Sequence, residues 1–389
     1  MSAARAPLRR LGTLPVADFV ARYWQQRALC IRQALAGFRS PVTVENLLGL
    51  AADPQVESRL VSARGGRFQL RHGPFGARAL PSRQRAGWTL LVQGVDLHAA
   101  AVADLAARFR FLPAARFDDV MISFATDGGG VGPHVDQYDV FLLQAQGRRR
   151  WRIARRFDPT PVAGLPLKVL AHFRHEEEWL LEPGDALYLP PGIAHEGVAV
   201  GDCVTISIGF RVPAWREVLD AWQDRQARML ADARGHDDRV PDATRRPTTA
   251  PARLPTAMVD AVARELQRRA PTRREAARTL LEHLTEPKSN VVFVAPHAPL
   301  GLARFSLAVA RRGVRLDLRS RMLFDGADIA INGELAPAAR TLRPLLRRLA
   351  NDGRLDAGAW AAPAGADRAA LLELLHDWYR AGWLHLAAL

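Results

Sequence analysis

Four glycines in five residues, Gly128–Gly132, stand directly before His134 and Asp136. Glycine permits positive φ and close backbone approach because it lacks a Cβ, so this run predicts a tight turn that leads into a strand. Residues two apart on a strand point to the same face, which lets His134 and Asp136 hold one metal ion together. A His-x-Asp triplet alone occurs often by chance, so the prediction depends on this turn and on a third ligand elsewhere.

A second motif supplies the third ligand. A turn at Glu182–Asp185 precedes a short apolar strand, and a corner at Pro190–Gly192 then turns the chain back to His195. We expect a neighbouring strand to bring His195 to His134 and Asp136. Two histidines and one carboxylate on one face of a metal leave the opposite positions open, an arrangement typical of non-haem Fe(II) oxygenases.

We also predict an arginine that binds a carboxylate. After a predicted turn at Gln144–Gly147, strand alternation places Arg149 on the same face as Trp151, with Arg148 and Arg150 on the opposite face. An arginine inside a barrel is costly unless a carboxylate meets it, and a guanidinium binds a carboxylate through two parallel hydrogen bonds. The partner is either a dicarboxylate co-substrate or a structural Asp or Glu, and we favour the co-substrate.

Short runs of β-branched and aromatic residues surround these motifs and indicate a β-barrel or a double-sheet jelly roll. Strands are predicted over residues 88–95, 120–124, 138–143, 149–153, 186–189 and 204–210. Helices are predicted before them, over 18–24 and 43–50, the second with Thr43 as its N-cap. His172 and His175, next to three glutamates, are interpreted as surface residues.

After Pro213 the apolar pattern becomes helical. One stripe of a long helix contains Trp215, Val218, Leu219, Trp222 and Met229. The stripe is explained either by packing within its own domain or by dimerisation, which two tryptophans in a charged segment mildly favour. Polar, proline-containing residues 235–251 predict a loop or hinge, and a second helix is predicted over 258–266.

The last hundred residues indicate a winged-helix-like module. Helices are predicted over 276–284, 342–351 and 371–382, and strands over 290–294 and 314–318. One of these helices is basic, through Arg340, Arg343, Arg347 and Arg348. Because no base-reading face is visible, a direct role in nucleic-acid binding is disfavoured.

The formal net charge of +14 comes almost entirely from arginine, since Lys168 and Lys288 are the two lysines among 54 basic residues. This charge fits an acidic partner, and it fits a merely arginine-rich surface equally well. Cys30 and Cys203 lie in no paired motif, which argues against a disulfide framework or a thiolate zinc site. No signal peptide or membrane-spanning segment is apparent, so we expect a soluble cytoplasmic protein.

Three segments, Gly128–Phe141, Gly147–Arg152 and Leu181–Gly197, together resemble the bacterial JmjC-domain, cupin-type ribosomal oxygenases. The match is close over residues 120–211. The resemblance implies an α+β fold with a JmjC double-stranded β-helix over 1–212, a helical dimerisation region over 213–270 and a winged-helix-like domain over 271–389. It further implies a homodimeric enzyme that uses Fe(II), 2-oxoglutarate and O2.

Within that family, the bacterial enzymes hydroxylate the β-carbon of an arginine in the large-subunit ribosomal protein conventionally numbered sixteen. The resemblance makes His134, Asp136 and His195 the iron ligands, and Arg149 the residue that binds the distal carboxylate of 2-oxoglutarate. It suggests further site residues: Ser123 and Thr205 as supports for the co-substrate, Asp127 for a substrate guanidinium, and Tyr138 to shape that pocket. Ala125 lacks the polar group of some relatives, and a turn or packing role explains Asp127 and Tyr138 equally well.

Two other functions stay open at this point. A cupin enzyme with another metal and no 2-oxoglutarate would keep the three ligands but would have no use for Arg149. A ribosome- or nucleic-acid-binding factor with a vestigial cupin would need none of them, and the intact ligand set argues against it. A histone demethylase is less attractive, because nothing in the sequence resembles a chromatin-reading module.

Overall fold

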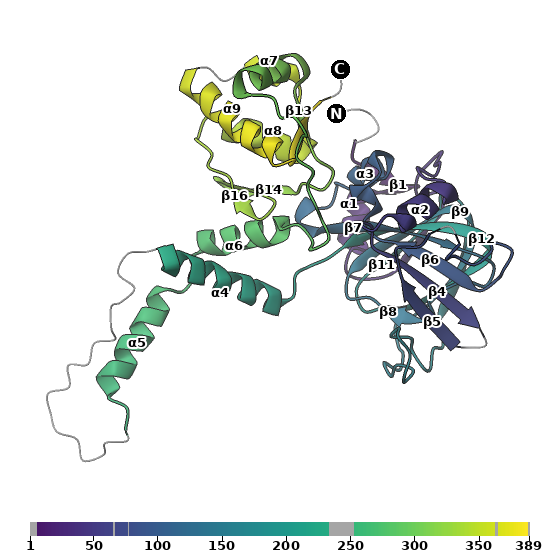
Figure 1. Ribbon diagram of the computed structural model, residues 1–389. Helices are drawn as coiled ribbons and strands as arrows, with labels where there is room; N and C mark the ends of the chain where they lie inside the picture. The colour runs from purple at the N-terminus through teal and green to yellow at the C-terminus, as the bar shows by residue number, and fades with distance from the viewer. Residues whose placement is uncertain (1–5, 65–66, 77, 233–252, 362–364, 388–389) are drawn as a thin grey trace.

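The computed structural model describes residues 6–64, 67–76, 78–232, 253–361 and 365–387. Figure 1 shows a β-rich unit from the first half of the chain, a helical arm that leaves it, and a second compact unit from the last third. The loop predicted over 235–251 lies outside the described residues. None of the helices in the described part is long and apolar enough to cross a membrane.

An antiparallel ten-stranded sheet forms the first unit. Its order is β3-β11-β9-β12-β7-β6-β4-β5, with β10 paired to β9 and β8 paired to β12. The strands are β3 (Leu29–Ile31), β4 (Ser58–Arg64), β5 (Arg67–His72), β6 (Trp88–Val92), β7 (Phe117–Ala125), β8 (His134–Val135), β9 (Asp139–Ala154), β10 (Glu177–Leu181), β11 (Ala186–Leu189) and β12 (Ala194–Phe210). A separate hairpin joins β1 (Arg10–Leu11) to β2 (Leu14–Pro15). This topology confirms the predicted jelly roll.

Strands β9 and β12 are longer than predicted. The single strand β9 replaces the two strands predicted over 138–143 and 149–153, so the turn predicted at Gln144–Gly147 is wrong. Gly147 bends the strand instead, because its φ is 62° and a Cβ there would lie 2.1 Å from the Asp202 carbonyl oxygen. The two bent strands stay paired along their lengths, with a register shift between Val200 and Val204. This continuous pairing fixes the position of β9 side chains relative to those of β12.

Three helices cover one face of the sheet: α1 (Val16–Arg22), α2 (Val44–Ala52) and α3 (Ala100–Ala107). Thr43 caps α2 as predicted, since its hydroxyl accepts from the Asn46 N–H and the Asn46 side chain accepts from the Thr43 N–H. Phe141 of β9 packs in the core beneath these helices. Its neighbours Val140 and Leu142 point the other way and line a cavity, as strand alternation requires.

The helical arm consists of α4 (Trp215–Asp232), α5 (Thr256–Arg268) and α6 (Arg273–Thr285), which confirm the three predicted helices. Helix α4 packs against α6, where Arg225 forms an ion pair with Glu282. Helix α5 extends away from both units and contains no buried residue.

The C-terminal unit contains helices α7 (Leu302–Arg312), α8 (Arg343–Asp352) and α9 (Gly365–Arg380). Two small sheets accompany them, β17-β13-β18 and β14-β15-β16. Their strands are β13 (Val314–Leu316), β14 (Met322–Asp325), β15 (Asp328–Ile331), β16 (Glu334–Leu335), β17 (Arg354–Leu355) and β18 (Leu384–Leu386). One core joins the helices, with Phe305, Leu346 and Leu375 fully buried.

The strand predicted over 290–294 is wrong. The segment is not paired in any sheet of the described chain, and Val292 and Val294 are more than half exposed. Strand-forming residues need a partner strand to become a strand, and this segment connects α6 to α7 instead.

The basic helix predicted in this unit is α8, and two of its arginines are engaged locally. Arg348 pairs with Asp352 and Asp356, and Arg347 donates to the Gly326 carbonyl while covering the Phe324 ring. These contacts reduce the charge available to an outside partner.

Candidate metal centre

The glycine run forms the turn that the sequence predicted. Gly128 and Gly132 have positive φ, and a Cβ on Gly130 would lie 2.6 Å from the Gly197 carbonyl oxygen. The turn leads into β8, where His134 is the residue directly opposite His195 of β12. The pairing of β8 with β12 therefore brings the two histidines together.

Asp136 lies just beyond β8, which ends at Val135, so the three residues are not all on regular strands as predicted. The Asp136 carbonyl accepts from the Gly192 N–H at 2.8 Å, so the corner that precedes His195 also holds Asp136. The two sequence motifs thus contact each other directly at the site.

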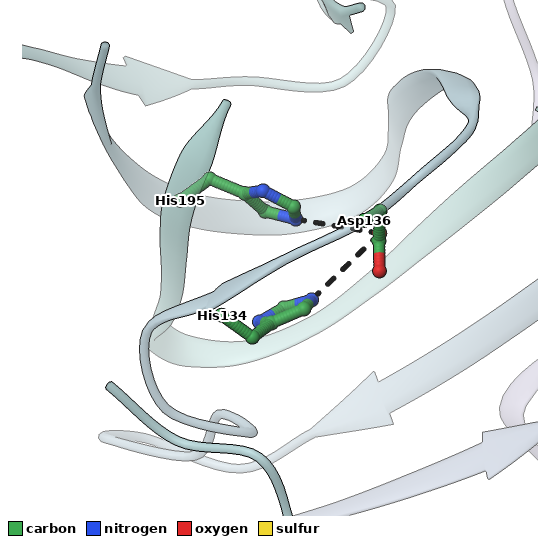
Figure 2. A group of neighbouring side chains, drawn as sticks. All are labelled: His134, Asp136 and His195. Atoms are coloured by element: carbon green, nitrogen blue, oxygen red, sulfur yellow. Dashed lines mark ion pairs between the residues drawn. The ribbon is translucent and has the colours of Figure 1, made fainter. Parts of the chain in front are cut away.

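Three ligand atoms converge here, as Figure 2 shows. The Asp136 Oδ2 atom lies 3.8 Å from His134 Nε2 and 3.7 Å from His195 Nε2. The ligand atoms all lie within 4.8 Å of one another, so one ion can bind all three at bonds of about 2.1 Å after small side-chain rotations. Among the described residues this is the one group of three such side chains suited to a metal ion.

Hydrogen bonds at Nδ1 orient both imidazoles and leave their Nε2 atoms free to bind a metal ion. His134 Nδ1 lies 3.0 Å from the Gly132 carbonyl oxygen, and His195 Nδ1 lies 3.0 Å from that of Ile193. A carbonyl oxygen only accepts, so each Nδ1 carries the proton and each Nε2 presents its lone pair. Burial, together with the neighbouring His134, lowers the pKa of His195 to about 4, which keeps this imidazole neutral at physiological pH.

Arg149 extends the site. As predicted, Arg149 and Trp151 are buried while Arg148 and Arg150 are exposed. The Arg149 guanidinium lines the same cavity as the triad, and its Nε and Nη2 atoms are buried with no hydrogen-bond partner among the described residues. None of the ion pairs in the described chain includes Arg149, so the structure supplies no Asp or Glu to pair with it. A buried guanidinium of this kind fits a carboxylate ligand.

The cavity has a volume of about 300 Å³ and is lined by β4 to β9, by β12 and by the 155–176 loop. Its wall contains two further buried donors without a partner in the described chain, the Thr89 hydroxyl and the Trp151 Nε1. The sequence analysis missed Thr89, Arg59 and Lys168, which also line the cavity. No local motif marks them, because only the register of β4 and β6 and the course of the loop bring them here.

The remaining predicted site residues are placed as follows. Ser123 is buried and lines the cavity, whereas Thr205 lies opposite it on β12 and donates its hydroxyl to the Gln144 side chain. Tyr138 lines the cavity, and burial, with the nearby Asp136 carboxylate, raises the pKa of its hydroxyl.

Asp127 does not line the cavity. Its carboxylate accepts from the Gly201 N–H at 2.8 Å, so the structure favours the turn role over the substrate role predicted for it. His172 and His175 are exposed, in agreement with their interpretation as surface residues.

Comparisons with known proteins bear on both units. The family model described as "JmjC domain" matches residues 104–218, and the one described as "ROXA-like winged helix" matches residues 266–385. A third, "AraC-like ligand binding domain", matches residues 169–286, which overlap the second half of the jelly roll.

The chain is 42% identical over 213 residues to the ribosomal protein uL16 3-hydroxylase of Escherichia coli. That alignment covers 54% of this chain, and it spans little more than half, 57%, of the length of the relative. The structural likeness extends further: the crystal structure of YcfD from Escherichia coli superimposes with a TM-score of 0.84 at 32% identity, over 97% of this chain and all of YcfD. YcfD in complex with cobalt and 2-oxoglutarate superimposes with a TM-score of 0.82. With a JmjC domain, a ROXA-like winged helix and a likeness to YcfD that covers 97% of this chain and all of YcfD, the chain belongs to the bacterial JmjC-domain ribosomal oxygenases.

Proposed function

We propose that the protein is an Fe(II)- and 2-oxoglutarate-dependent dioxygenase that hydroxylates the β-carbon of an arginine in the large-subunit ribosomal protein uL16. The observation that carries this proposal is the placement of a buried, unpartnered Arg149 guanidinium in the same cavity as the His134, Asp136 and His195 ligand atoms. The uL16 hydroxylase and the cobalt and 2-oxoglutarate complex of YcfD support the choice of substrate and cofactors.

The residues present fit both groups. Two imidazole nitrogens and one carboxylate oxygen are a ligand set that suits Fe(II), and His134, Asp136 and His195 would hold the ion with room for further ligands. Arg149 would bind the distal carboxylate of 2-oxoglutarate, with Ser123 and Thr89 as nearby hydroxyl donors on the same wall. Thr205 would support this wall through Gln144. When bound, iron, 2-oxoglutarate and O2 supply the oxidation that inserts one oxygen atom into a C–H bond, with succinate and CO2 as the other products.

The chain itself positions the reactants. The strand register fixes the direction of Arg149 relative to the triad, and the carbonyls of Gly132 and Ile193 fix the orientation of the two imidazoles. Apolar side chains such as Val140 and Leu142 line the same cavity and reduce the access of water. Tyr138 would shape the substrate side of the pocket, where it lies near Asp136.

We further propose that the protein acts as a homodimer through α4 and α5 of the helical arm, within a dimerisation region over 213–270 that separates an oxygenase domain over 1–212 from a winged-helix-like domain over 271–389. Trp215 and Leu219 of α4 are 83% and 53% exposed, and Leu266 of α5 is 67% exposed. Apolar side chains that gather on projecting helices of a charged segment are characteristic of an interface between subunits. A ribosomal substrate would place the enzyme in the cytoplasm.

The central test is incubation of uL16 with the purified protein, Fe(II), 2-oxoglutarate and O2. Mass spectrometry should detect a gain of one oxygen atom on one arginine. Asp136→Ala should abolish both this product and the binding of Mn(II), measured by calorimetry, because the triad loses its only carboxylate. His175→Ala, at an exposed position in the same unit, is the control. Full activity of Asp136→Ala would refute the metal centre.

A further inference from the structure

The wall of the cavity carries a second arginine, Arg59 of β4, which differs from Arg149 in its surroundings. The Arg59 side chain is one-third exposed, whereas Arg149 is buried. Arg59 Nη2 donates to Gln93 Oε1 at 3.2 Å, and its Nε forms a long ion pair with Glu57 Oε1 at 4.0 Å. The Nη1 donors have no partner among the described residues, so Arg59 can reach a ligand that enters from solvent.

A chain of polar contacts leads from Arg59 to the C-terminal unit. Gln93 Nε2 donates to Asp119 Oδ2 at 2.7 Å, and Lys288 Nζ lies 2.9 Å from the same oxygen. Lys288 lies on the segment that joins α6 to α7, and its Nζ is also 3.0 Å from Asp118 Oδ1 of β7. Asp119 is 6% exposed, so its carboxylate is held firmly between Gln93 and Lys288.

The network reaches the cavity through strand β7. Asp119 and Met121 project from the same face of β7, and Met121 lines the cavity beside Arg59. The Met121 sulfur is 4.0 Å from Arg59 Nη2, which gives the guanidinium a second point of contact. Lys288, which precedes α7 of the C-terminal unit, is therefore connected through Asp119 and Gln93 to the Arg59 side chain in the cavity wall. These contacts restrict the direction in which Arg59 points.

The charges of the cavity indicate what Arg59 binds. Its lining contains Arg59, Arg149 and Lys168 as cations, and Asp136 is the one carboxylate among the described lining residues. Asp136 belongs to the metal centre and Arg149 is placed for the co-substrate. Of the two remaining cations, Lys168 lies on the 155–176 loop, whereas Arg59 projects from strand β4 and is held by Gln93, so Arg59 is the one with a fixed direction toward an incoming polypeptide. A guanidinium donates and cannot accept, so its partner must be a hydrogen-bond acceptor.

We propose that Arg59 is a positioning residue that donates to a hydrogen-bond acceptor of the polypeptide substrate at the mouth of the cavity, and that Lys288, Asp119 and Gln93 fix its direction. This inference rests on the proposed function for the identity of the polypeptide. The C-terminal unit then contributes to substrate binding without entering the cavity.

The test compares five variants of the full-length enzyme on a synthetic uL16 peptide that contains the target arginine. Arg59→Met should raise the KM for the peptide about tenfold, through loss of a charge-assisted hydrogen bond, and change the KM for 2-oxoglutarate by less than about twofold. Arg59→Lys should recover part of the loss, because an ammonium donates without the planar fork of a guanidinium.

Lys288→Met should raise the KM for the peptide about threefold with kcat little changed, because Lys288 acts only through the orientation of Arg59. Lys288→Arg should restore the KM of the wild type, because arginine keeps the positive charge beside Asp119. The matched control is Arg274→Met, which removes an equal charge and an ion pair between α6 and Asp328 of β15. Arg274→Met should leave both KM values unchanged.

An unchanged peptide KM in Arg59→Met, or an equal rise in the KM for 2-oxoglutarate, would overturn the assignment of Arg59. If Lys288→Met behaves as the control does, the positioning network is refuted. Should Arg59→Met fail to fold, the comparison of Lys288→Met with Lys288→Arg decides. If the wild type does not hydroxylate the peptide, the proposed function fails instead, and calorimetric titration of the metal-free protein with the peptide still measures the contribution of Arg59.

Discussion

Arg148 and Arg149 are neighbours of identical chemistry, yet the alternation of β9 exposes one and buries the other. The buried guanidinium has two nitrogen atoms without a partner in the described chain, a state that costs free energy in the unliganded protein. The cost is explained if Arg149 is kept for a ligand.

Arg149→Met should therefore separate function from stability. We expect the KM for 2-oxoglutarate to rise at least about tenfold, because the bidentate contact to the carboxylate is lost. The free energy of unfolding of the metal-free protein should rise by about 1 kcal/mol, because methionine has no charge to bury. Enzyme kinetics and urea denaturation measure the two effects, with exposed Arg148→Met as the control. A variant that loses stability and keeps its affinity for 2-oxoglutarate would contradict the role of Arg149.

Asp96 is a second buried charge at the residue scale, next to the cavity between the two units. Burial, opposed by a hydrogen bond from the Val120 N–H and supported by Asp119, raises the pKa of Asp96 from 3.8 to about 6. Between these two values the folded protein keeps a proton that the unfolded chain has lost, so stability falls as the pH rises through this window. Above it both states are ionised, and the full penalty, roughly 3 kcal/mol, is present.

Asp96→Asn keeps the acceptor for Val120 and removes the charge. The variant should gain stability relative to the wild type as the pH rises from about 5 to about 8, by roughly 1 to 2 kcal/mol. Urea denaturation at the two pH values measures this difference. If the variant and the wild type differ in stability by the same amount at both pH values, Asp96 is not the titrating group.

At the scale of elements, the turn before β8 decides whether the two histidines face each other. A Cβ at Gly130 would lie 2.6 Å from a backbone oxygen of β12, the strand that carries His195. This contact cannot be relieved by a side-chain rotation. The turn and the strand must move apart if the glycine is replaced.

Gly130→Ala should cost about 2 kcal/mol of stability and weaken Mn(II) binding, because His134 is displaced from His195. Gly49→Ala is the control, and it should stabilise the protein by about 0.5 to 1 kcal/mol. Gly49 lies within α2, and no atom is within 4 Å of the position that a Cβ would occupy. Thermal denaturation and calorimetry measure the two properties. Unaltered metal binding in Gly130→Ala would refute the positioning role of the turn.

Sequence patterns predicted elements well where the pattern itself is sufficient. The helix after Pro213 and the N-cap at Thr43 depend on nearby residues, and both are confirmed. The segment 290–294 has a strand-like sequence but no partner, and the turn predicted before Arg149 is a bend within β9. Strand pairing decided both results: residues 290–294 have no partner strand in the described chain, and β9 stays paired with β12 on both sides of the bend. Strand pairing involves residues far away in the sequence.

At the scale of the whole molecule, the helical arm leaves apolar side chains exposed that neither unit covers. Trp215 and Leu266 lie on different helices and both are more than half exposed. Leu307, on α7 of the C-terminal unit, has a similar exposure of 65%. Leu307 can therefore serve as a control: it is about as exposed as Leu266 but does not belong to the helical arm.

Trp215→Glu and Leu266→Glu should shift the protein from dimer to monomer in sedimentation velocity, because a charge at a buried contact of an interface is left unpaired. Leu307→Glu should leave the sedimentation coefficient unchanged. A wild-type protein that sediments as a monomer would refute the proposed dimer.

The sequence alone determined the chemistry of the metal centre. The turn, the two histidines and the carboxylate are encoded within short motifs, and strand alternation predicted that Arg149 shares a face with Trp151, because that relation holds for any two residues two apart on a strand. Tertiary structure decided which residues share the cavity with them. Thr89, Arg59 and the network to Lys288 come from separate strands and from the C-terminal unit, and Asp127 turned to Gly201 although it stands beside the glycine run. Proximity across a sheet or between units depends on strand register and packing, which no local pattern contains.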